Sequence, residues 1–176
     1  ALMEEEPSAD PPYTLPLNIP QSEDLVGGKG ATLSTLLSSH ELPVPRGFAI
    51  TTRAFHLILK KNGLLPWIRD QLSRLGPNAM QDMEGVSRAL QDSVMNAEIP
   101  WELTADVESA LTGHGLDHSR LAMRSSAVGE DLQASFAGQY QSLINVRPED
   151  WAGAFKQVLA SKYSPHAIAY RIGQGM

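Results

Sequence analysis

Residues 27–30 (Gly-Gly-Lys-Gly) form a glycine-rich segment that leads directly into apolar residues with helical spacing. Successive glycines let backbone N–H groups converge, a helix start adds partial positive charge, and Lys29 adds a full positive charge. This combination suits an anion such as phosphate. The segment is not a Walker A loop, and it does not fit the Gly-x-Gly-x-x-Gly pattern. Spacing alone leaves open an ordinary turn with a solvated lysine.

Arg124 closes a short apolar run and is followed by Ser125 and Ser126. A guanidinium at the end of a strand can hold phosphate oxygens through a fork of N–H groups, and the serine hydroxyls add donors. The alternative is an ion pair of Arg124 with Glu130 or Asp131 in the same segment. Both interpretations fit the spacing.

The remaining polar groups do not indicate a metal site. Glu130 and Asp131 are neighbours in a loop, where adjacent carboxylates diverge and are solvated. The loop that follows, residues 135–139, has small residues around one Phe, which is typical of a loop near a ligand and also of a plain hairpin connection. The histidines show no metal-ligand spacing. They are His40, His56, His114, His118 and His166.

Helices and strands must hold these segments in place. Glycine and proline breaks together with apolar periodicity predict an α/β or α+β fold in which helices are prominent. In the first part of the chain we expect a helix from about Lys29, a strand ending at Thr51 and a helix over 53–61. Helices follow between 64 and 111, with breaks at Gly76-Pro77 and Pro100. The rest is expected to form a strand–loop–strand over 120–146 and helices after Pro148 and Ser164.

Composition limits the class of protein. The 176 residues suit one compact domain, and the absence of Cys excludes thiolate catalysis, Cys-ligated metals and disulfides. The net charge of −6 is concentrated before Lys29, so the rest of the chain is neutral, which argues against a duplex nucleic-acid face. Residues 1–20, acidic and proline-rich, are expected to be an extended leader with little structure of its own. No apolar run approaches a membrane span of roughly 20 residues, and we expect a cytoplasmic protein without membrane partners.

Three motifs occur together in a fixed order. They are Gly-Gly-Lys-Gly-Ala at 27–31, Val-Pro-Arg-Gly-Phe-Ala-Ile-Thr at 44–51, and the segment Arg-Ser-Ser-Ala-Val-Gly-Glu-Asp-Leu-Gln-Ala-Ser-Phe-Ala-Gly-Gln-Tyr at 124–140. With Ala-Ile-Ala-Tyr-Arg at 167–171, this order resembles the N-terminal ATP-binding region of the pyruvate phosphate dikinase / phosphoenolpyruvate synthase family, which includes rifampicin phosphotransferases. The resemblance covers about residues 25–171.

The resemblance implies the first lobe of an ATP-grasp module over residues 21–176, with a mixed sheet and flanking helices. Such a module transfers a phosphoryl group from ATP, with Mg2+, to a histidine on another domain, which then phosphorylates pyruvate or another acceptor. Matched residue by residue, Lys29 takes the place of the triphosphate-contacting lysine and Arg124 that of the phosphate-clamping arginine. Gly138 and the Ser142 hydroxyl fall where the family's loop covers the phosphates.

The chain also departs from the family pattern. The family's module is about twice as long, and its adenine-contacting strand and its metal-holding Glu and Gln lie beyond the position that matches Met176. The segment around His166 imitates the phosphohistidine motif but lacks the preceding glycines and has Pro165 before the histidine, so we interpret His166 as structural. The loop between Leu132 and Ala134 has one residue where many relatives have two.

Two hypotheses follow. In the first, the chain is a fragment, the first lobe of a split ATP site, which is inactive alone and works with the phosphohistidine and acceptor domains of a longer chain. In the second, it is a non-catalytic regulatory or interaction module that keeps the lobe. Neither hypothesis fixes the acceptor, which is pyruvate, an antibiotic hydroxyl or a glucan.

Overall fold

The computed structural model describes residues 12–39, 45–75, 80–126 and 142–173. Its helices are α1 (Glu23–Ser39), α2 (Thr52–Lys61), α3 (Leu64–Ser73), α4 (Met80–Asn96), α5 (Trp101–Gly113), α6 (Trp151–Ser161) and α7 (Pro165–Gly173), with a 3-10 turn over Pro148–Asp150. Its strands are β1 (Thr14–Pro16), β2 (Phe48–Ile50), β3 (Leu121–Arg124) and β4 (Ser142–Val146). This is a mixed α/β architecture in which helices dominate, as predicted.

The strands of the described residues form two separate antiparallel pairs, β1 with β2 and β3 with β4. The single mixed sheet that the family resemblance implied is therefore not what these residues form. Each strand has only three to five residues. The strands β3 and β4 are consecutive in the chain, and consecutive strands that fold back on each other pair antiparallel. The two strands of the strand–loop–strand predicted over 120–146 are confirmed, and they pair as a hairpin, while the loop between them lies outside the described residues.

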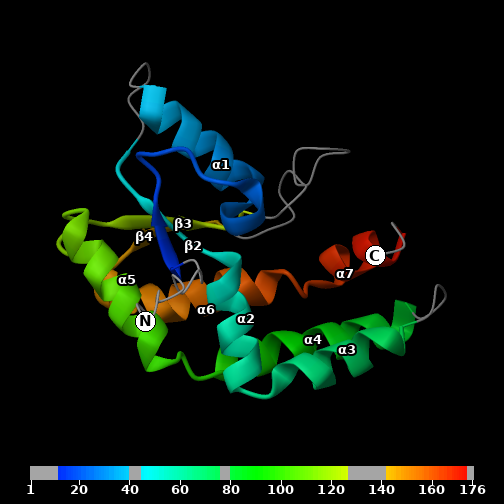
Figure 1. Ribbon diagram of the computed structural model, residues 1–176. Helices are drawn as coiled ribbons and strands as arrows, with labels where there is room; N and C mark the ends of the chain where they lie inside the picture. The colour runs from blue at the N-terminus through cyan, green and yellow to red at the C-terminus, as the bar shows by residue number, and fades with distance from the viewer. Residues whose placement is uncertain (1–11, 40–44, 76–79, 127–141, 174–176) are drawn as a thin grey trace, which may run out of the picture.

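The apolar core lies between the helices and the inner face of the β3–β4 hairpin. Leu103, Val107 and Leu111 of α5 recur at four-residue spacing and are all buried, as that spacing predicts. In α6, Trp151, Phe155 and Leu159 are buried in the same cluster. Figure 1 shows α6 running through the middle of the molecule, and it contacts both α4 and the hairpin.

Part of the expected leader has a defined place in the fold. Thr14–Pro16 is extended, but it pairs with β2, so that Thr14 lies opposite Ile50. The backbone N–H of Thr14 also donates a 2.8 Å hydrogen bond to the Asp106 carboxylate of α5. The interpretation of this segment as lacking structure missed β1, because its partner strand is more than thirty positions along the chain. The domain boundary at residue 20 stays a prediction.

No helix among the described residues is long and apolar enough to cross a membrane. The cytoplasmic location expected from the sequence stays a prediction.

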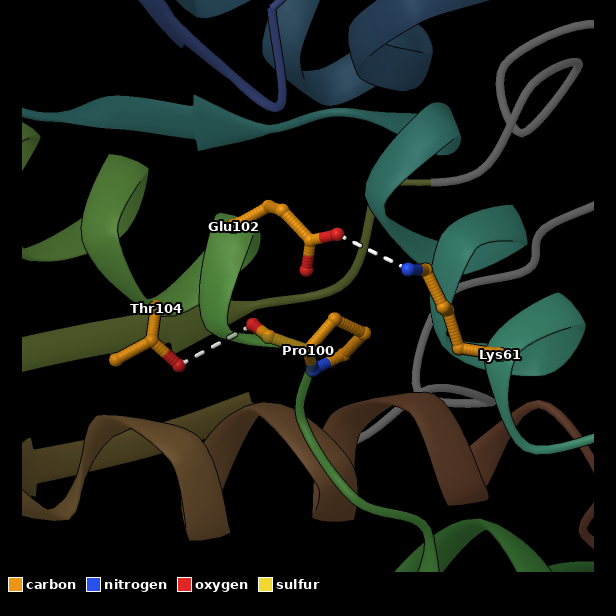
Figure 2. Close-up of polar contacts among 4 residues, drawn as sticks. All are labelled: Lys61, Pro100, Glu102 and Thr104. Atoms are coloured by element: carbon orange, nitrogen blue, oxygen red, sulfur yellow. Dashed lines mark hydrogen bonds and ion pairs between the residues drawn. The ribbon is translucent and has the colours of Figure 1, made fainter.

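An ion pair joins α2 to the start of α5. Lys61 Nζ lies 3.0 Å from Glu102 Oε1. Figure 2 shows this contact beside the hydrogen bond from the Thr104 hydroxyl to the Pro100 carbonyl. Hydrogen bonds from the Glu102 backbone N–H and from Lys61 hold the pKa of the Glu102 carboxyl below its ordinary value of 4.5. A carboxylate in the first turn is also favoured by the partial positive charge of a helix start. This contact is therefore stronger when Glu102 is ionised.

The Glu102 contact predicts a pH dependence of stability. Because the pKa of Glu102 is lower in the folded chain than in the unfolded one, its contribution is present above pH 4.5 and is lost as the pH falls through the folded-state pKa. We expect Glu102→Gln to lower the free energy of unfolding at pH 7, and the gap from the parent to close as the pH falls through the folded-state pKa of Glu102. Denaturant unfolding of both chains over this pH range measures the gap. A gap that stays constant would contradict the assignment.

Candidate functional site

α1 has a kink in its first turns and is not one continuous helix. Gly27 interrupts it with φ 72° and ψ 170°, a conformation outside the helical region that only glycine adopts readily. α1 begins at Glu23, earlier than the start predicted near Lys29, and its turns after the kink follow the glycine-rich segment as the sequence predicted. Lys29 is exposed, whereas the glycines on either side of it are buried.

The end of β3 lies directly against this kink. A Cβ atom added to Gly27 would fall 2.3 Å from the Ser126 carbonyl oxygen and 2.5 Å from the Ser126 Oγ. The absence of a side chain at Gly27 therefore allows the backbone of Ser126 to pack on the helix entrance. Two segments separated by almost a hundred residues meet at this point.

A hydrogen bond fixes the same contact. The Gly30 backbone N–H donates to Ser126 Oγ at 2.9 Å. The first N–H groups of a helix have no partner within the helix, and here a hydroxyl from a distant strand accepts one of them. Lys29 is next to Gly30, and Arg124 is two residues before Ser126. The fold thus places the backbones that carry these two cationic side chains side by side.

The hairpin brings Ser142 to the same place. Arg124 at the end of β3 is the register partner of Ser142 at the start of β4, and both residues are exposed. Side chains of directly opposed residues in an antiparallel pair project from the same face of the sheet. Leu121 and Met123, on the other face of β3, pack against the core. Arg124 and Ser142 therefore share the face of the hairpin that is turned away from the core.

Some predicted residues lie outside the described ranges. Gly138 does, as do Glu130 and Asp131, so the alternative ion pair of Arg124 with those two acids stays open. Among the described residues, no acidic side chain forms an ion pair with Arg124. His166 is exposed and lies near the start of α7. The interpretation of His166 as a structural residue, and not as a phosphohistidine, stays a prediction.

Two other features bear on ligand binding. The described residues contain no group of three or more His, Asp or Glu that could hold a metal ion. An open hollow of about 530 Å³ runs along β4, where residues 143–147 line it together with Arg120, Glu149 and Asp150. This hollow is not the candidate site, because neither Arg124 nor Ser142 lines it.

Sequence reasoning missed the role of Ser126 in this geometry. The Arg-Ser-Ser motif marked both serines as phosphate donors, and in the structure the Ser126 Oγ also accepts a hydrogen bond from the Gly30 N–H, a contact that does not use the proton of the hydroxyl. No local signal separates the two roles. The glycine at position 27 was the available clue, because a glycine just before a helix indicates a positive φ or a close backbone approach.

The fold and this geometry define an α/β unit with a candidate anion-binding site at a helix start. Comparison with known proteins gives the family. Residues 23–176 match the family described as "Pyruvate phosphate dikinase, AMP/ATP-binding domain". The chain belongs to this family, which confirms the resemblance seen in its motifs.

Several curated relatives are similar to most of the chain. A phosphoenolpyruvate synthase of Pseudomonas aeruginosa is 37% identical over 157 residues, which cover 85% of this chain and 20% of the relative. A probable phosphoenolpyruvate synthase of Methanocaldococcus jannaschii is 35% identical, covering 86% of this chain and 13% of the relative. A rifampicin phosphotransferase of Bacillus cereus is 35% identical, covering 86% and 18% respectively. The chain therefore spans a fifth or less of the length of these relatives.

Proposed function

We propose that the chain is the triphosphate-binding part of an ATP-dependent phosphotransferase, with Lys29, Arg124, Gly138 and Ser142 contacting ATP and Arg124 also acting on the transferred group. In the longer protein, a phosphoryl group passes from ATP to a histidine on another domain and then to pyruvate or a similar acceptor. The family match and the names of the relatives support a phosphotransferase. The ATP-grasp architecture is part of the proposal.

One observation carries the proposal: the hydrogen bond from the Gly30 N–H to Ser126 Oγ, which joins the segment of Lys29 to that of Arg124. A nucleotide triphosphate carries several negative charges, and the neighbouring donors here are an ammonium, a guanidinium, a hydroxyl and a helix start. This donor set fits a polyphosphate.

The chemistry of such a site is electrostatic. Phosphoryl transfer depends chiefly on holding the phosphates in line and on neutralising the charge that develops on their oxygens. Lys29 would act as a point charge at the helix entrance, and Arg124 would hold two oxygens through its fork of N–H groups. Mg2+ would supply further neutralisation when bound, and, following the family pattern, we propose that its Glu and Gln ligands belong to the longer protein, beyond the position of Met176.

The test uses the longer protein. Incubated with labelled ATP and Mg2+, it is expected to form an acid-labile phosphohistidine, and Lys29→Ala and Arg124→Ala are expected to reduce the rate at which this label appears. If both variants keep the parental rate, the second hypothesis, a non-catalytic regulatory or interaction module, gains support instead.

The isolated 176-residue chain is expected to bind ATP weakly and to transfer no phosphoryl group. Single donors in sites of this type contribute roughly 3–4 kcal/mol to transition-state stabilisation, and the isolated chain would lack the metal-holding and adenine-contacting groups. Calorimetric titration of the chain with ATP and Mg2+ measures this. Micromolar affinity would contradict the proposal that the site is split.

A further inference from the structure

We propose that Ser126 is a positioning residue that sets the distance between the two cationic side chains of the site. This inference rests on the proposed function, because it concerns the same phosphate-binding residues. It assigns to Ser126 a role different from that of a phosphate donor. Ser126 holds the entrance of α1 against the end of β3, and it acts on ATP through Lys29 and Arg124.

The first step of the argument is the covalent spacing. Gly30, whose N–H donates to Ser126 Oγ at 2.9 Å, is the residue after Lys29. Ser126 is two residues after Arg124, which is the last residue of β3. If Gly30 and Ser126 move apart, the backbones of Lys29 and Arg124 therefore move with them, because at most two residues separate each pair.

The second step is packing. The Ser126 carbonyl occupies the space that a side chain at position 27 would need, and Gly27 Cα can approach it only because glycine has no Cβ. On the far side of the kink, a Cβ on Gly30 would meet Val26 at 2.9 Å. The helix entrance is therefore closely packed on Ser126 and on its own preceding turn. Ser126 contributes both a backbone contact and a side-chain hydrogen bond to the same junction.

The third step concerns the state of the hydroxyl. An Oγ that accepts from a helix N–H satisfies a backbone donor which would otherwise need water or a ligand. The donor to this hydroxyl oxygen is a backbone amide of the protein itself. A residue that only served as a phosphate donor would leave the Gly30 N–H to be satisfied when ATP binds. The two roles therefore differ in the ATP-free protein, which makes them separable by experiment.

The experiment compares Ser126→Ala with the parent in the longer protein. Loss of one neutral hydrogen bond and of the spacing it holds is expected to lower kcat/KM for ATP by about 3- to 10-fold. Without ATP, hydrogen exchange at the Gly30 amide is expected to become faster, because its acceptor is gone. A purely structural role would not give the two effects together.

Ser87→Ala is the matched control. The Ser87 hydroxyl donates a 2.6 Å hydrogen bond to the Tyr163 carbonyl in a buried junction of α4 with the end of α6, away from Lys29 and Arg124. This variant is expected to lower the thermal midpoint of unfolding while leaving kcat/KM for ATP and exchange at Gly30 unchanged. It shows how much of any effect comes from lowered stability alone.

The outcomes separate this inference from the proposed function. If Lys29→Ala and Arg124→Ala lose ATP-dependent activity but Ser126→Ala keeps its kcat/KM, the positioning role is wrong and the proposed function stands. A fall in kcat/KM with unchanged exchange at Gly30 would also overturn it, because that result indicates direct phosphate contact. If all three variants keep their activity, the proposed function itself is wrong.

Discussion

Replacing Arg124 by alanine in the longer protein is expected to lower kcat for phosphotransfer from ATP by about 10²- to 10³-fold. The size follows from the loss of one preorganised donor at a position where charge develops during the reaction. Arg124→Lys is expected to recover part of this loss, since an ammonium restores the charge but not the paired N–H groups. Steady-state kinetics at saturating ATP measures the change.

Arg120→Ala is the control for this prediction. Arg120 is also an exposed arginine of the same hairpin, but it lies at the opposite end, where its guanidinium donates a 3.5 Å hydrogen bond to the Asn145 carbonyl. This variant is expected to keep nearly the parental kcat. Equal losses at the two positions would indicate a general effect of hairpin charge and would contradict a specific role for Arg124.

Gly27→Ala is expected to destabilise the chain and to abolish ATP use in the longer protein. Its φ of 72° with ψ of 170° lies in a region that costs a residue with a side chain about 1–3 kcal/mol. The added Cβ would also overlap the Ser126 carbonyl, so the entrance of α1 would have to move away from β3. Denaturant unfolding measures the first effect, and ATP kinetics measures the second.

Gly85→Ala provides the same chemical change with the opposite expectation. Gly85 lies in α4, it is exposed, and a Cβ there would meet no atom within 4 Å. Alanine is favoured over glycine inside a helix by roughly 0.5–1 kcal/mol, so this variant is expected to be slightly more stable than the parent. A Gly27→Ala chain with unchanged stability would show that the kink does not depend on glycine.

The sequence predicted the elements whose signals are local. The four-residue spacing of Leu103, Val107 and Leu111 predicted α5, and Pro100 stands at its N-cap as expected. The break expected at Gly76-Pro77 falls between α3 and α4, outside the described residues. Apolar periodicity and breaker residues act within one or two turns of chain, which is why these predictions could be made from the sequence.

The features that the sequence did not predict depend on distant partners. β1 exists because it pairs with β2, and nothing within the leader indicates that pairing. The helix expected over 53–61 begins at Thr52, and Thr51 stands at its N-cap, but the Thr51 hydroxyl donates to the Pro12 carbonyl and does not cap the helix. The choice among several acceptors of a Thr hydroxyl is made by tertiary packing, not by sequence spacing.

In the candidate site, too, some features were predictable from local sequence and others depend on distant partners. Lys29 and Arg124 were candidates from residue type, and the family resemblance assigned them their phosphate-binding roles. The contact between their two backbone segments, and the register that sets Arg124 opposite Ser142, are seen in the fold. The role of Ser126 could not have been read from its motif, because it depends on a glycine 99 positions earlier.

A crystal structure of the longer protein with an unreactive ATP analogue tests the central claim most directly. The account predicts that Lys29 Nζ and the Arg124 guanidinium both lie about 2.7–2.9 Å from phosphate oxygens of one nucleotide. A nucleotide held elsewhere, with the two side chains directed to different parts of the surface, would contradict it.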